Sequence, residues 1–188
     1  MQGLLRLSGI IDAINSRIGR ATGWLILITV LISAGNAVMR YTIHWSSNAW
    51  LEIQWYLYSA VFLLCAAYAL LRNEHVRIDI IAGNLSRRTQ AWIDLFGTLF
   101  FLLPMAVLLV WLSWPVFVDS YVRQEMSSDA GGLLRWPVKL LMPVGFALLA
   151  LQGVSELIKR VAFLMGRIPD PAGARHDPHV EPAPAEPK

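Results

Sequence analysis

The sequence predicts an all-α integral membrane protein with four transmembrane helices, preceded by an N-terminal amphipathic helix at the membrane surface. Of its 188 residues, 56% are hydrophobic and only 15% are charged, and the mean hydropathy is +0.50. These values lie outside the usual range of soluble domains. A membrane-spanning helix needs ~20 mostly apolar residues, and runs without any charge occupy 21–39, 53–71, 95–118 and 140–155.

The first 20 residues differ from the spans because charges interrupt them. Five apolar residues recur at helical spacing, and polar residues lie largely between them: Leu4, Leu7, Ile11, Ile14 and Ile18. This pattern predicts an amphipathic helix over 1–20 that lies in the membrane surface and contacts lipid. The alternative is an ordinary extension beside the membrane.

The transmembrane domain is expected over 21–165, and a proline-rich tail follows over 166–188. Six of the ten prolines fall in that tail, which cannot bury a core and is expected to be disordered. Asn84 or Ser86 can cap a helix before the third span, and Pro104 and Pro115 within that span are expected to kink or end it. Pro143 fits the first turn of the fourth helix.

The orientation follows from the basic residues. Of the 16 Lys and Arg, twelve lie before the first span, between the second and third spans, or after the fourth. The positive-inside rule therefore places both termini and the 72–94 connector in the cytoplasm, and the other two connections outside. The net charge of +3 reflects this topology and does not indicate nucleic-acid binding.

Few polar groups lie in or beside the spans. Asn36 is expected to hydrogen-bond a neighbouring helix near the outer leaflet, because an unpaired amide in hydrocarbon is costly. Glu52 lies at the mouth of the second span, with Tyr56 on the same helical face. Glu52 is either a solvated boundary residue or a contact with a partner subunit.

The run NEHVRID follows the second span, and three of its ionisable residues alternate along the chain, His75, Arg77 and Asp79. An extended chain puts all three on one face, and a helix makes His75 and Asp79 neighbours. In either case a cation and an anion can pair at the inner surface and fix the path of the chain, although a solvated loop is the alternative.

Catalytic and cofactor motifs are not found. His44 and His75 are the histidines near the membrane, and the predicted topology puts them on opposite sides, which argues against a haem-binding bundle. The sequence has no phosphate-binding glycine loop and no metal-ligand cluster. We therefore expect no enzymatic activity and no cofactor.

Three stretches, in this order and spacing, resemble one family: NAWLEIQWYLYSAVFLL, NEHVRIDII and GGLLRWPVKLLMPVGFALLALQGVSELIK. They are similar to the small membrane subunit (DctQ type) of tripartite ATP-independent periplasmic (TRAP) transporters. The resemblance runs from about Arg20 to Arg160. The sequence departs from it at Ile53, where a second acidic residue is frequent in that family.

The resemblance implies a multi-pass subunit of the bacterial inner membrane. It would scaffold a large, sodium-coupled, elevator-type membrane subunit and help to dock a periplasmic solute-binding protein, for uptake of an organic acid or related solute. The residues expected at the partner-subunit interface, or in a structural role, are Asn36, Glu52, Tyr56, His75, Arg77 and Asp79. Those expected to dock the binding protein are Arg123, Glu125, Asp129, Gly131 and Gly132.

Two other classes stay open from the residues alone. The chain could be a self-sufficient, homo-oligomeric small transporter in which Glu52 is the coupling carboxylate, or a membrane assembly factor. Against the former, Glu52 lies at a span boundary, and the sequence has no broken-helix pair or internal repeat of the kind from which transport sites are built.

Overall fold

The computed structural model describes residues 2–44, 47–73 and 85–169, and in these residues the chain is helical with short connections. The helices, in chain order, are α1 Gln2–Thr42, α2 Asn48–Arg72, α4 Arg87–Gly97, the π-helical turn η1 Thr98–Leu102, α5 Leu103–Val122 and α6 Trp136–Leu164. Helices α4, η1 and α5 follow one another without a break. Four helical segments in the described part are long and apolar enough to cross a membrane, which confirms the four predicted spans.

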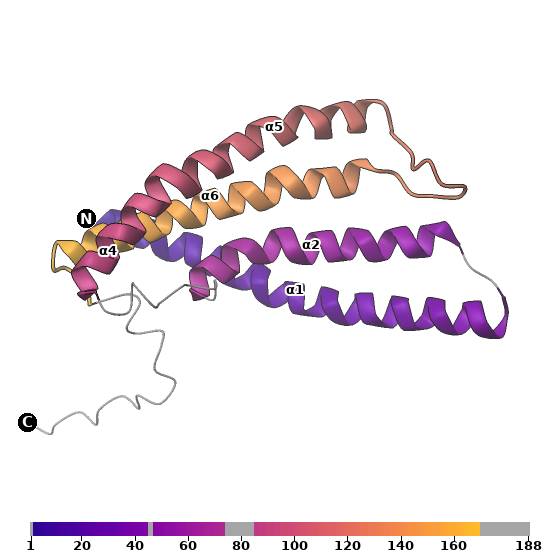
Figure 1. The fold of residues 1–188 in the computed structure, drawn as a ribbon, viewed down its shortest axis with the longest axis horizontal. Coiled ribbons are helices and arrows are strands. Elements are labelled where there is room, and N and C mark those ends of the chain that lie inside the picture. Colours follow the sequence, from indigo (N-terminus) through magenta and orange to yellow (C-terminus); the bar gives the residue numbers. More distant parts are fainter. Residues whose placement is uncertain (1, 45–46, 74–84, 170–188) are drawn as a thin grey trace, which may run out of the picture.

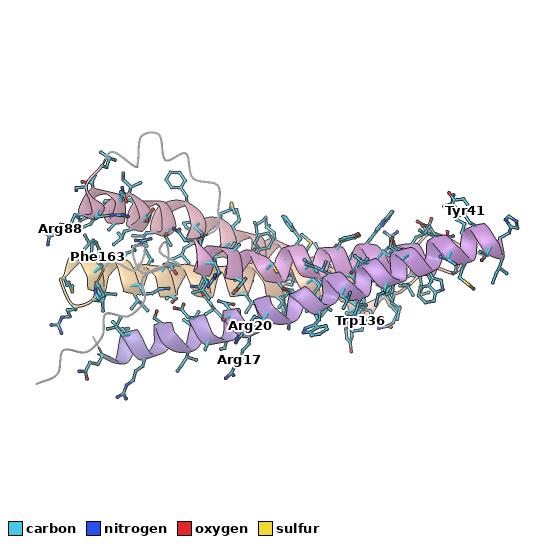
Figure 2. All side chains as sticks on the ribbon, turned by 90° about the horizontal axis from the view of Figure 1, so that it is seen from below. Arg17, Arg20, Tyr41, Arg88, Trp136 and Phe163 are labelled. Carbon is cyan, nitrogen blue, oxygen red and sulfur yellow. The ribbon has the colours of Figure 1, made fainter. Side chains whose placement is uncertain are left out.

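Helix α6 is the central element of the bundle, since it packs against α5, α2, α1 and α4 (Figure 1). We call the end that carries the α1–α2 and α5–α6 connections the connector end, and the opposite end the basic end. Figure 2 shows Tyr41 and Trp136 toward the connector end and Arg17, Arg20 and Arg88 toward the basic end. The start of α1 and the end of α6 both lie at the basic end (Figure 1), as an even number of spans requires.

Helix α1 differs from the prediction, because the separate helix expected over 1–20 is continuous with the first span. Its 41 residues make it roughly 60 Å long, about twice the ~30 Å of a bilayer core. Its N-terminal half therefore continues past the hydrocarbon at the basic end and packs on α6. Leu4, Leu7 and Ile14 face outward, whereas the polar residues Ser8 and Asn15 are buried. Ile11 of the same apolar stripe is buried with them, so hydrophobic periodicity did not show which residues of α1 face α6.

The third span begins at a capped terminus, with the Ser86 side chain accepting a hydrogen bond from the Thr89 N–H at 3.3 Å. The π-helical turn η1 ends two residues before Pro104, whose ring would crowd the carbonyl four residues earlier in a regular α-helix. Ala106 follows Asp94 by twelve residues. In a regular α-helix their side chains would therefore point in directions about 120° apart around the helix axis. The wider π turn absorbs about one residue, so that both side chains face α6.

Helix α6 begins earlier than predicted. Trp136 is its first residue and Pro137 fills the first-turn position that the sequence analysis gave to Pro143. Pro143 lies inside the helix and is buried. The helix ends at Leu164, where Gly166 takes a φ of 70° and its N–H binds the Phe163 carbonyl.

The helix contacts are made by small and polar residues at seven-residue intervals. Such spacing gives a left-handed seam, and small residues let membrane helices approach closely because lipid leaves no hydrophobic force between them. A Cβ on Gly145 would lie 2.8 Å from the Leu63 carbonyl oxygen, so α2 and α6 touch backbone to backbone there. The buried residues of this pattern are Ser8, Asn15, Thr22 and Thr29 on α1, Ala60 and Ala67 on α2, Ala106, Ser113 and Ser120 on α5, and Gly145, Gln152 and Lys159 on α6.

Two predictions fall outside the described residues. His75, Arg77 and Asp79 lie in 74–84, and most of the proline-rich tail lies in 170–188. Both predictions therefore stay as the sequence made them.

Candidate functional site

The connection between α5 and α6 folds as a small hairpin over 125–135, which we call the connector hairpin. Two backbone hydrogen bonds close it, from the Arg135 N–H to the Glu125 carbonyl at 2.8 Å and from the Ser127 N–H to the Leu133 carbonyl at 2.9 Å. Its tip turns at Gly131, whose φ of 72° favours glycine. The hairpin extends past the ends of α5 and α6 (Figure 1).

Three residues of α2, which we call the clamp, hold this hairpin: Asn48, Glu52 and Tyr56. They are spaced four apart and so share one face of the helix. Asn48 Nδ2 donates to the Ala130 carbonyl at 3.0 Å, and the Tyr56 hydroxyl donates to the Leu134 carbonyl at 2.9 Å. The clamp therefore joins the start of the second span to the loop between the third and fourth.

Glu52 is the centre of the clamp. Its side chain accepts a hydrogen bond from the Ser127 hydroxyl and another from the Leu133 N–H at 2.6 Å, and the residue is only 6% exposed. Gly132 makes this approach possible, because a Cβ there would lie 2.8 Å from Glu52 Oε1 and would overlap Ser127 Cβ. The carboxylate is thus engaged by the chain's own connector.

The charges around the hairpin are paired more fully than the sequence indicated. Lys139 binds Glu125, and this hydrogen bond is the main reason why the pKa of the Glu125 carboxyl lies below its ordinary value. Arg123 pairs with Asp119 at 2.7 Å, in the open. Glu125 is therefore half-buried and paired within the chain, whereas Asp129 stays exposed at the tip.

A pocket of about 320 Å³ lies beside the hairpin, between α2 and the start of α6. Charges of both signs line it together with aromatic and polar groups: Glu52, Trp55, Tyr56, Ser59, Asp129, Arg135, Val138 and Lys139. Such a surface suits contact with a polar partner surface. The described residues contain no cluster of three or more side chains able to hold a metal ion.

A second polar contact joins α1 to α6 at the basic end, and the sequence analysis missed it. Asn15 Nδ2 donates to Gln152 Oε1 at 2.8 Å, and Gln152 Nε2 donates to Asp12 Oδ1 at 2.9 Å. The Ser155 hydroxyl donates to the same Asp12 oxygen at 2.6 Å, and Lys159 Nζ lies 3.1 Å from Asp12 Oδ2. We call this set the α1–α6 polar seam.

The seam had a visible signal in the sequence. Polar residues recur every seven positions along α1, at Ser8, Asn15, Thr22, Thr29 and Asn36. A four-residue spacing of small residues overlaps this repeat, through Thr29, Ser33 and Ala37. In the structure Thr29 is buried, Ser33 is half-buried and Ala37 is exposed.

The structure thus sorts the expected site residues into separate places. Most of them meet at the hairpin and its clamp: Glu52, Tyr56, Glu125, Asp129, Gly131 and Gly132. Asn36 is separate from them, in a groove between α1 and α2. Asn48, Ser127 and Lys139 complete the site, and the i, i+4, i+8 spacing of the clamp could have pointed to Asn48.

The fold and site define a helical membrane protein with four segments able to span a membrane, in which α2 holds the α5–α6 connection in place. Residues 28–163 match the family described as tripartite ATP-independent periplasmic transporters, DctQ component. The chain belongs to that family, as a small membrane subunit of such a transporter. Comparison with curated proteins and with solved structures gave no match.

Proposed function

We propose that the chain scaffolds the large membrane subunit of a TRAP transporter in the bacterial inner membrane and presents the connector hairpin to the periplasmic solute-binding protein. Sodium coupling and elevator-type movement would belong to the large subunit. The cargo would be an organic acid or related solute, delivered by the binding protein.

The scaffold role is supported by how little apolar surface the chain buries by itself. Its contacts use small and polar residues, while large side chains face outward along two of its spans. Those exposed by half or more include Trp24, Val30, Leu31 and Val38 on α1, and Met105, Val107, Leu108, Trp111 and Leu112 on α5. These faces can pack against lipid and against a partner's helices.

The docking role rests chiefly on one observation, the three-point clamp from α2. A loop that only connected two helices would not need a buried carboxylate and two further side chains to fix it. Holding a loop in its bound shape lowers the entropy lost on binding, and the clamp leaves the tip residues Ser128, Asp129 and Gly131 exposed. The engagement of Glu52 by Ser127 and Leu133 also weighs against the alternative in which Glu52 is a coupling carboxylate.

The test is the dependence of uptake on binding-protein concentration, in liposomes that hold both membrane subunits. Asp129→Lys should raise the concentration that gives half-maximal uptake, most strongly at low salt, because such charges mainly set association rates. The control is Arg17→Glu, a charge reversal of the same size on an exposed residue toward the basic end. An unchanged concentration dependence in Asp129→Lys at low salt would overturn docking at this hairpin.

A further inference from the structure

A groove of about 330 Å³ runs between α1 and α2, toward the connector end. Its lining is apolar except for one amide, and it consists of Leu31, Ile32, Gly35, Asn36, Met39 and Trp50. A Cβ on Gly35 would meet nothing within 4 Å, so the side of α1 is open to an approaching group there.

Asn36 gives this groove a chemical requirement. Its Oδ1 is buried and has no hydrogen-bond partner among the described residues. The other polar groups of the seven-residue repeat on α1 do find partners: Ser8 on Ser155, Asn15 on Gln152, Thr22 on the Gly19 carbonyl, and Thr29 on the Leu25 carbonyl. Asn15 Oδ1 is unpaired too, but Asn15 is 1% exposed and closed in between α1 and α6, whereas Asn36 lines an open groove.

An unpaired amide in a membrane span is costly, since hydrocarbon offers neither donor nor acceptor. Acyl chains filling the groove would leave Asn36 unpaired. A helix that carries a hydroxyl or amide side chain would pair it and also cover the apolar walls beside Gly35, which is how polar residues join membrane helices.

We infer that this groove receives a transmembrane helix of the large membrane subunit, and that a Ser, Thr, Asn or Gln side chain of that helix hydrogen-bonds the Asn36 amide. The inference rests on the proposed scaffold function and says which face of the chain meets the partner. The groove lies on the α1–α2 side of the bundle, away from α5, which contacts α6 (Figure 1).

The experiment is capture of the large subunit by affinity-tagged chain from membranes that contain both. Asn36→Leu should lower the captured amount by between about threefold and tenfold, the range expected for one interhelical hydrogen bond. Gly35→Leu should lower it further, because the new side chain fills the groove. The control is Gly23→Leu, since Gly23 is an exposed glycine of the same helix with nothing within 4 Å of its Cβ position.

A second measurement separates docking from folding. In the isolated chain, Asn36→Leu removes an unpaired amide, so resistance to unfolding in detergent should be equal to or higher than that of the wild type. Lowered resistance in this variant would overturn the inference, because the amide would then hold the chain itself together.

The capture results also keep the two proposals distinct. If Asn36→Leu and Gly35→Leu capture as much of the large subunit as the wild-type chain does, the groove assignment is overturned. Lipid would then occupy the groove, and the scaffold function would stand. Equal loss in Gly23→Leu would likewise overturn the assignment to this groove. No capture by the wild-type chain would overturn the scaffold function, and the groove inference with it.

Discussion

Replacing Gln152 by Leu should release the N-terminal half of α1 from α6. Gln152 is fully buried and accepts from Asn15 Nδ2 while it donates to Asp12 and, within its own helix, to Glu156. Leu is of similar size and keeps the packing, so the variant removes mainly these hydrogen bonds.

The expected loss can be worked from the contacts. Two of the bonds cross between helices, and each is worth about 0.6 kcal/mol in membrane proteins. The Asn15 amide, already unpaired at Oδ1, would lose its Nδ2 partner as well, which adds about 1 kcal/mol for a buried unsatisfied group. The total of about 2 kcal/mol corresponds to a roughly 30-fold larger population with α1 detached.

Trypsin can measure that population, because cleavage of a rapidly opening segment follows the equilibrium fraction that is open. Arg17 is exposed on α1 within this half, and its cleavage in the purified protein should be roughly 30-fold faster in Gln152→Leu. The control is Ser113→Ala, since Ser113 is also buried but its hydroxyl binds only carbonyls of its own helix. Its cleavage rate should stay within about twofold of the wild type. Equal rates in Gln152→Leu and wild type would refute the idea that the seam holds α1.

Three further predictions concern the loop and the topology. Gly132→Ala should detach the hairpin from Glu52, because the new Cβ would lie 2.8 Å from that carboxylate; faster amide hydrogen exchange at residues 127–135 would show it, and unchanged exchange would contradict it. Glu125 has a lowered pKa owing to Lys139, so the stabilisation from this pair is complete above the ordinary carboxyl pKa and is lost as the pH falls through the lowered value. The carboxyl titration followed by NMR should therefore move up in Lys139→Met, and an unmoved midpoint would show that the pair contributes nothing. In a Cys-free background, an impermeant thiol reagent added outside should label Ser128→Cys and not Ser86→Cys, and the reverse pattern would invert the topology.

Composition and charge were enough to predict the membrane class and the four spans, since both depend on sums over many residues. The positions of helix ends were less predictable. The uncharged run that defined the fourth span begins at residue 140, but α6 begins at Trp136 and continues past Ser155 to Leu164. Charged residues can continue a helix beyond hydrocarbon, so charge marks the membrane boundary and not the end of the helix.

The inward-facing polar side of α1 was hidden for a different reason. Periodicity shows that two faces differ, but it does not say which face meets protein. In a water-soluble helix the apolar face packs inward, whereas in α1 the polar residues Asn15 and Asp12 face Gln152, where they find hydrogen-bond partners. Only the pairing with α6 decides between these arrangements.

The hairpin site was predictable in part. The glycine pair at 131–132 marked the turn, and Glu52 stood out as a carboxylate at a span boundary. Glu52 contacts the loop through a residue far along the chain, because the Leu133 N–H that it binds lies 81 positions away. No local pattern encodes such a contact, so the sequence suggested a partner for Glu52 without identifying the chain's own loop.

The most direct test of the scaffold function is solute uptake by liposomes that contain the large membrane subunit of the transporter, with and without this chain. The periplasmic binding protein and its solute are supplied outside, with an inward sodium gradient. We predict uptake only when both membrane subunits are present, and no uptake by this chain alone. Uptake at the full rate by the large subunit and binding protein without this chain would contradict the account.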